Sequence, residues 1–130
     1  MEMKTRKELA IEKRNQGYNC AQAVACAFCD KTGLDEETLF RLTGAFGMGM
    51  GNMEGTCGAL TGAAVVIGLA SGADAGAPPT KLSRQLMERF AQRNHSVLCK
   101  ELKGRDSGTV LRSCPDCIQD ACEFLEEILG

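Results

Sequence analysis

Hydrophobic positions along the chain recur with helical spacing, and polar caps and glycine stops separate the segments that carry them. The longest segment, residues 80–103, carries the stripe Leu82, Leu86, Phe90, Val97 and Leu102. Further helices are expected at residues 4–16, 20–31, 35–42 and 57–70, and from residue 113 or 114 to residue 129. No segment shows the sustained period-two alternation of a strand. The pattern predicts an all-α, single-domain bundle of five to six helices over residues 1–130.

The segment 57–70 is apolar almost all round and is expected to be the buried central helix, with Thr56 as its N-cap. Gly58 and Gly62 lie one turn apart, and small residues at that spacing let a neighbouring helix pack closely. We therefore expect another helix to lie against both glycines. The segment 71–79 is predicted to be a turn because Pro78 and Pro79 cannot continue a helix.

A glycine- and methionine-rich stretch, residues 44–55, precedes the central helix and is called the Gly/Met loop below. Glycine at this density indicates a chain that bends sharply or approaches another group closely. The stretch is not a P-loop, because it lacks Gly-Lys-Ser/Thr and no strand precedes it.

The composition excludes some partners. A net charge of -2 over 130 residues gives no electrostatic reason to bind nucleic acid or an acidic membrane, and the chain has no tryptophan. The apolar run of the central helix is too short to cross a bilayer, and the charged N-terminal segment has no signal-peptide core. We expect a cytoplasmic protein with no nucleic acid and no membrane partner. A homodimer and an unidentified redox partner remain open.

Eight cysteines are the most informative feature of the sequence: Cys20, Cys26, Cys29, Cys57, Cys99, Cys114, Cys117 and Cys122. In a reducing compartment this number indicates redox chemistry, metal binding, catalysis or simple packing. Cys20, Cys57 and Cys114 are each expected in the first turn of a helix, where free N–H groups and the helix dipole lower a thiol pKa.

We expect these three helix starts to meet under the Gly/Met loop. Cys57 would be the activated thiolate, with a pKa below the free-thiol value of about 8.5. Cys20 or Cys114 would then be its resolving partner. Cys99, near the far end of its predicted helix, gains no such help.

Two C-x-x-C pairs are present. Cys26 and Cys29 are predicted to lie inside a helix, which favours a packing role for both. Cys114 and Cys117 are predicted to lie at the start of a helix, which is the local arrangement of a dithiol/disulfide couple. A thiolate zinc site, an iron–sulfur cluster, or Cu(I) on the loop methionines Met48, Met50 and Met53 remain alternatives. Covalent c-type haem is excluded because no C-x-x-C is followed by histidine. The single histidine, His95, is expected on a helix surface.

Several stretches form a combination that is specific although each piece is weak. They are GYNCAQAV from Gly17, the Gly/Met loop, EGTCGALTGA from Glu54, CKEL from Cys99, and CPDCIQDACEFLEEIL from Cys114. Together they resemble the C_GCAxxG_C_C family of small redox-active proteins, over nearly the whole chain after the first helix. The resemblance implies that the family's residues are Cys20, Cys57, Cys99 and Cys114, with Gly58, Ala59 and Gly62. The order Cys57-Gly58-Ala59 departs from the family's Gly-Cys-Ala.

The leading hypothesis is a thiol-based redox protein that uses this cysteine cluster for a dithiol/disulfide cycle or for electron transfer. Oxidoreductase activity is left open. Two alternatives come from other classes: a thiolate metal or iron–sulfur protein without turnover, and a helical interaction module whose cysteines only pack. Cys20, Cys57, Cys99 and Cys114 are the candidate ligands in the metal case, and Cys117 is the candidate for a second dithiol.

Overall fold

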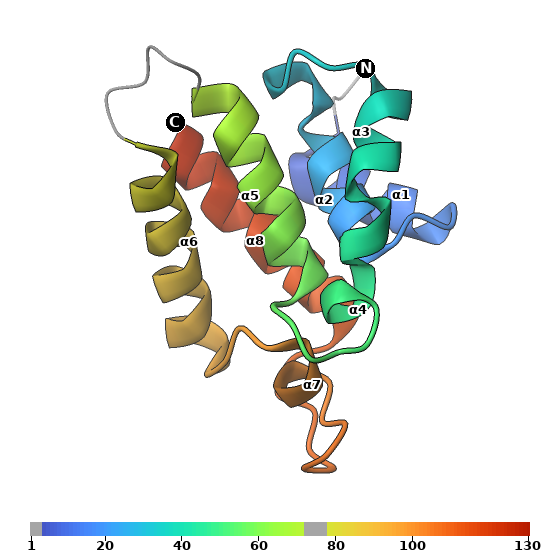
Figure 1. Cartoon of the computed structure of the whole chain (residues 1–130), viewed down its shortest axis with the longest axis vertical. Coiled ribbons are helices and arrows are strands. Elements are labelled where there is room, and N and C mark those ends of the chain that lie inside the picture. The colour runs from blue at the N-terminus through green and yellow to red at the C-terminus, as the bar shows by residue number, and fades with distance from the viewer. Residues whose placement is uncertain (1–3, 72–77) are drawn as a thin grey trace.

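The computed structural model describes residues 4–71 and 78–130, and this part of the chain is helical without strands (Figure 1). The elements are α1 (Arg6–Asn15), α2 (Cys20–Ala27), η1 (Cys29–Lys31), α3 (Glu36–Thr43), η2 (Gly44–Phe46), α4 (Gly47–Met50), α5 (Gly58–Ser71), α6 (Pro79–Asn94), α7 (Cys99–Leu102) and α8 (Cys114–Leu129). The predicted all-α class is confirmed. The described helices slightly outnumber the expected five to six, because α4 and α7 are additional single turns.

Helix α5 packs closely against α2, as its small residues predict. A Cβ built on Gly62 would lie 2.4 Å from the carbonyl oxygen of Ala21, so no larger residue fits without moving the backbone. A Cβ on Gly58 would lie 2.4 Å from the Sγ of Cys20. The two glycines therefore bring the start of α5 into direct contact with the start of α2.

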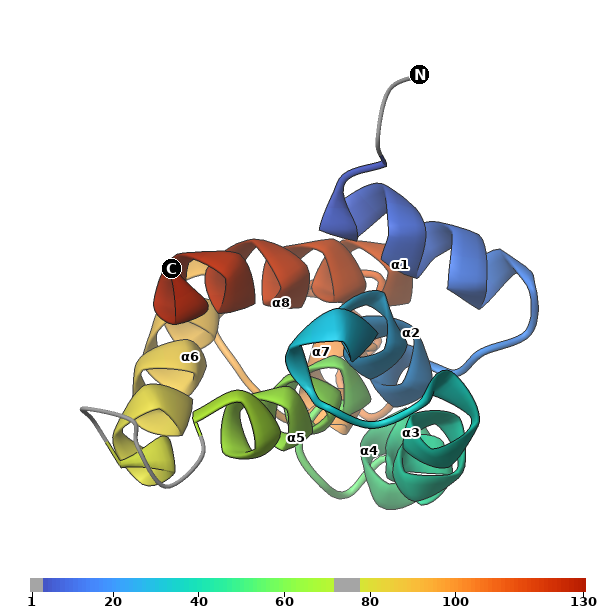
Figure 2. The same cartoon turned by 90° about the horizontal axis from the view of Figure 1, so that it is seen from above.

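Helix α8 packs against both α5 and α2 and completes the core (Figure 2). Its predicted cap is confirmed, since the Ser113 side chain accepts a hydrogen bond from the backbone N–H of Asp116. The inner face of α8 is fully buried at Ile118, Ala121, Cys122 and Leu125.

The prediction of one helix over residues 80–103 is wrong. Helix α6 ends at Asn94, and His95 adopts a left-handed conformation with φ 70°. The Asn94 side chain is buried and donates a hydrogen bond of 3.1 Å to the Asp120 carboxylate. This carboxylate also accepts a hydrogen bond from Arg112. This polar anchor holds the end of α6 against α8, and the chain turns away at the exposed His95. A new helical turn, α7, then begins at Cys99.

Other predicted boundaries shift by shorter distances. The segment predicted as a helix over 20–31 ends at Ala27 and continues as η1, so Cys29 lies outside α2. Helix α6 begins at Pro79, one residue before the predicted start at residue 80, and Pro78 occupies the N-cap position. Most of the turn expected at 71–79 lies outside the described residues. None of the described helices is both long and apolar enough for a membrane span.

The first residues of α2, α5 and α8 lie at one end of the bundle, beside α4 and α7 (Figure 1). This is the end at which the sequence places its helix-start cysteines.

Candidate functional site

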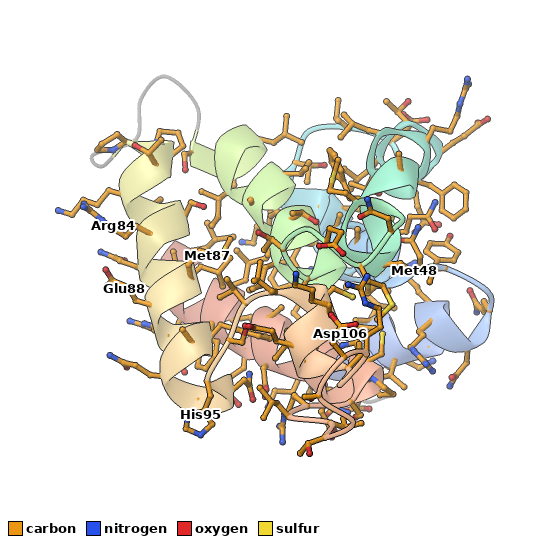
Figure 3. All side chains as sticks on the ribbon, turned by 60° about the horizontal axis from the view of Figure 1, so that its bottom comes forward. Met48, Arg84, Met87, Glu88, His95 and Asp106 are labelled. Carbon is orange, nitrogen blue, oxygen red and sulfur yellow. The ribbon has the colours of Figure 1, made fainter. Side chains whose placement is uncertain are left out.

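A pocket of about 470 Å³ opens at this end of the bundle. Its lining comes from α1, α2, the Gly/Met loop, α5, α7 and α8, and consists of Arg14, Gly17, Tyr18, Asn19, Cys20, Met48, Met53, Cys57, Gly58, Cys99, Lys103 and Cys114. The structure thus places all four cysteines of the predicted site around one cavity. Figure 3 brings this end forward, with Met48 on the α4 side and His95 away from it at the end of α6.

Cys20 and Cys114 form the first pair of thiols, across the starts of α2 and α8. The Cys20 thiol donates a hydrogen bond to the sulfur of Cys114, and this bond lowers the pKa of Cys114 to about 5, with help from the charge of Lys103 and a hydrogen bond from Arg14. Donation to Cys114, together with burial, raises the pKa of Cys20 far above its usual range. At neutral pH the pair therefore holds one proton, with the thiolate on Cys114.

Cys57 and Cys117 form a second pair, beneath the first. Their side chains are 1% and 0% exposed, and the Cys57 thiol donates a hydrogen bond to Cys117. This bond and the nearby Lys103 lower the pKa of Cys117, against the effect of burial. The C-x-x-C cysteines of α8 thus each contact a cysteine of another helix.

The expectation that Cys57 is the activated thiolate is wrong. Its hydrogen bond to Cys117 and its burial raise its pKa well above the usual value. Cys57 also precedes α5 instead of opening it, because its carbonyl accepts the first helical hydrogen bonds, from Leu60 and Thr61. The N–H of Ala59 does reach the Cys57 sulfur, but this contribution is smaller than the two opposing ones.

Lys103 connects the two pairs. Its ammonium donates a hydrogen bond of 3.3 Å to the sulfur of Cys117, and it lies close enough to Cys57 and Cys114 to interact with their charges. Burial lowers the pKa of Lys103, but the three sulfurs outweigh burial and raise it overall. Lys103 is therefore a half-buried cation held in place by sulfur.

The Gly/Met loop covers the pocket in a strained conformation. Met48, Met50 and Met53 all have positive φ, at 56°, 67° and 65°, a conformation that costs about 1 kcal/mol or more for a residue with a side chain. The loop is held by Cys99 and Lys100, whose N–H groups donate to Gly55 and Met53.

The strained loop contributes directly to the site. It directs the backbone N–H of Met48 at the sulfur of Cys20. It also brings Gly49 against Cys99, where an added Cβ would lie 2.5 Å from the Cys99 Cβ. The close approach expected of these glycines is therefore found at Gly49.

Cys99 lines the pocket but differs from the two pairs. It begins α7, and burial raises its pKa more than the charge of Lys103 lowers it. Among the described residues, no hydrogen bond of its thiol is found. The break after α6 is what brings Cys99 into the pocket, because a continuous helix would have carried it further along the α6 axis.

The remaining cysteines lie away from this end. Cys26 and Cys122 are core residues, 2% and 0% exposed, and burial raises the pKa of each, to about 11 and about 12. The Cys29 thiol donates to the carbonyl of Leu34. These three thiols fill or border the core, as expected for the Cys26–Cys29 pair.

All eight cysteines have free thiols. Within residues 4–71 and 78–130, no three or more His, Cys, Asp or Glu side chains are arranged to hold a metal ion.

The model of one protein family, described as "Putative redox-active protein (C_GCAxxG_C_C)", matches residues 18–128. The chain belongs to this family. No curated protein and no solved structure gave a significant match. The match covers both thiol pairs and the Gly/Met loop, and the geometry gives physical roles to the glycines and the alanine at the start of α5. Gly58 and Gly62 admit α2, while Ala59 directs its N–H at Cys57.

Sequence reasoning missed the two cations of the site. Lys103 follows Cys99 by four residues, a spacing that places both on one face of a helical turn and could have indicated it. Arg14 gave no such signal, because it lies in α1 and reaches the pocket only through the turn at Gly17, where φ is 106°.

Proposed function

We propose that this member of the redox-active family is a thiol–disulfide oxidoreductase, in which Cys114 is the attacking thiolate and Cys20 the resolving thiol. The observation that carries the proposal is the hydrogen-bonded Cys20–Cys114 pair at the pocket wall, with Arg14 and Lys103 beside it. A low-pKa thiol next to a second thiol is the arrangement that thiol–disulfide exchange requires.

The exchange proceeds in two displacements. The Cys114 thiolate attacks one sulfur of a substrate disulfide, forms a mixed disulfide with it, and releases the other substrate sulfur as a thiolate. Cys20 then gives up its proton and attacks the Cys114 sulfur, which releases the second substrate thiol and leaves a Cys20–Cys114 disulfide. The substrate disulfide gains two electrons from the Cys20–Cys114 pair, one proton from Cys20 and one proton from water, and the pair is left as a disulfide. A dithiol reductant returns the protein to its starting state.

The residues around the Cys20–Cys114 pair can support both displacements. Arg14 and Lys103 stabilise the thiolate before attack and again when Cys114 is the leaving group. The N–H of Met48 directed at Cys20 stabilises the thiolate that Cys20 becomes before the second displacement. Cys114 is only half-buried and lines the pocket, so a substrate sulfur can reach it. Cys99 is not needed for either step.

The test is the reduction of a small disulfide, with dithiothreitol as the reductant, by the full chain and three variants. Cys114→Ala is expected to lose the activity. Cys20→Ala is expected to stop at the mixed disulfide, which mass spectrometry of the intact protein detects as the added mass of the half-substrate. Cys122→Ala is the matched control, since it removes a buried thiol from the same helix and is expected to keep the activity.

Two outcomes contradict the proposal. One is a Cys114→Ala variant that reduces the disulfide as well as the Cys122→Ala control. The other is stoichiometric iron or zinc in the unaltered protein purified without oxygen, if the Cys114→Ala variant lacks both this metal and the visible or thiolate-metal absorption. That result would make the cluster a metal site.

A further inference from the structure

The proposed exchange uses only two of the thiols at this end of the molecule. Cys57 and Cys117 are joined by a hydrogen bond and are almost completely buried, although Cys57 forms part of the pocket wall at 1% exposure. A substrate in the pocket cannot reach Cys117, which does not line it. Yet the half-buried Lys103 donates to the Cys117 sulfur at 3.3 Å. If Cys117 only packed as a small apolar side chain, it would not need a cation beside its sulfur.

We propose that Cys57 and Cys117 form a second, buried dithiol/disulfide couple, which exchanges with the outer Cys20–Cys114 pair through the C-x-x-C of α8. The inference rests on the proposed function, because the outer pair is its entry point. It assigns a redox role to Cys117 and makes the site a store for two pairs of electrons.

The transfer needs no further oxidant. After the outer pair is oxidised, the Cys117 thiolate attacks the Cys114 sulfur, forming a Cys114–Cys117 disulfide and releasing Cys20 as a thiolate that takes up a proton. Cys57 then loses its proton and attacks the Cys117 sulfur. A Cys57–Cys117 disulfide forms and Cys114 leaves as a thiolate, ready for a second substrate. The inner dithiol is oxidised and the outer disulfide reduced, so the electrons balance.

The local structure permits the intermediate step. Cys114 and Cys117 lie three residues apart in the first turn of α8, with Pro115 at the position where its missing N–H leaves no hydrogen bond unmade. The N–H of Cys117 donates to the carbonyl of Ser113 at the very start of the helix, where few backbone bonds oppose a small adjustment. A disulfide across the first turn is accessible there, unlike one in the middle of a helix.

Lys103 stabilises three of the four thiolates that the transfer uses. Each displacement has a thiolate as attacking group and as leaving group, and the ammonium lies close to Cys57, Cys114 and Cys117, whereas Cys20 is faced by the backbone N–H of Met48. Cys122, which is also 0% exposed on α8, accepts no hydrogen bond from a cation among the described residues, and the charges of Arg6 and Lys7 lower its pKa less than burial raises it. The same helix therefore carries one thiol equipped for exchange and one that only packs.

The test maps disulfides in the full chain after brief exposure to excess small disulfide, followed by acid quenching, alkylation in denaturant and mass spectrometry. The expected result in the unaltered protein is loss of both thiol pairs, with a Cys57–Cys117 and a Cys20–Cys114 disulfide. The Cys117→Ala variant is expected to lose only the outer pair. The Cys57→Ala variant is expected to accumulate the Cys114–Cys117 disulfide, and Cys122→Ala to behave like the parent.

The outcomes separate this inference from the proposed function. If the unaltered protein forms only the Cys20–Cys114 disulfide and Cys57 and Cys117 are both recovered as thiols, the relay is wrong and the outer exchange stands. If no disulfide forms at either pair, both proposals fail. Mapping of the unaltered protein decides the question even if a buried variant does not fold.

Discussion

The pocket end of the molecule and its core contain the same residue, cysteine, at similar burial and with opposite chemistry. Cys26 and Cys122 are buried along the lengths of α2 and α8, and burial raises their pKa values to about 11 and about 12. Cys117 is as deeply buried as Cys122, on the same helix, yet its pKa is lowered. Burial alone therefore does not decide the state of a thiol in this protein.

A position at the start of a helix does not decide either whether the pKa of a thiol is lowered. Cys20 and Cys57 also lie where α2 and α5 begin, and the pKa of each is raised, because each donates its proton to a partner thiol. Cys114 and Cys117 accept those bonds and in addition face Lys103. In this comparison, an accepted hydrogen bond from a second thiol together with a nearby cation separates the cysteines whose pKa is lowered from those whose pKa is raised.

The sharpest test of this comparison is the pH dependence of alkylation. The thiolate is the form above the pKa, so a lowered pKa moves the onset of reaction to lower pH. At about pH 6, the thiolate populations of Cys114 and Cys26 differ by about 10⁵-fold. The weaker nucleophilicity of a low-pKa thiolate offsets about 10²- to 10³-fold of this. Peptide mapping after brief treatment with iodoacetamide should find Cys114 labelled at least about a hundredfold faster. Equal labelling would remove the distinction between the two regions.

The helix class and the positions of the helix-start cysteines could be predicted from the sequence, because capping and apolar spacing are local signals. In the structure these signals are the side chains of Ser113 and Asn19, which cap α8 and α2. The gathering of these helix starts was expected from the placement of the cysteines and from the family pattern, and the glycines of α5 permit it because they let α2 pack closely. The roles within the cluster could not be predicted, since which sulfur keeps the proton depends on contacts between helices.

The end of α6 shows the same limit. The stripe of apolar residues continues past Asn94, so local spacing predicts one long helix. The break is set by the buried bond from Asn94 to Asp120, twenty-six residues away in sequence. The same long-range contact decides that Cys99 lines the pocket, and that Lys103 points at the thiols.

The second prediction tests the close packing that joins the pocket end to the core. Gly62→Ala places a methyl group 2.4 Å from the Ala21 carbonyl oxygen, and is expected to lower the free energy of unfolding by about 1–3 kcal/mol. Gly68→Ala is the matched control on the same helix, because a Cβ there meets nothing within 4 Å. The control is expected to be neutral or stabilising by about 0.5–1 kcal/mol. Urea denaturation followed by circular dichroism measures both, and equal midpoints would show that α2 does not require the glycine.

The third prediction concerns the cation. Lys103→Met keeps a long apolar side chain and removes the charge, so the pKa of Cys114 should rise by about one unit, equivalent to about tenfold in thiolate population at pH values below the original pKa. The measurement is thiolate absorbance against pH. Lys100→Met is the control, because Lys100 lies on the same turn but pairs with Glu54. A pKa unchanged in Lys103→Met would leave the hydrogen bond from Cys20 and the contribution of Arg14 as the causes of the lowered pKa.

The fourth prediction has the smallest expected effect and concerns the substrate. The charged residues that line the pocket, Arg14 and Lys103, are both cations, in a chain whose net charge is -2. An anionic disulfide such as oxidised glutathione should therefore react with Cys114 faster than the cationic disulfide cystamine, by about tenfold at low ionic strength after correction for their intrinsic rates with a free thiol. The difference should shrink as salt is added, since the screening length falls to about 10 Å at 0.1 M. The unfolded protein provides the comparison, because its cysteines have no pocket and should follow the net charge alone. If cystamine reacts faster with the folded protein, the two cations serve only the protein's own thiolates, and the pocket selects its substrate by other contacts.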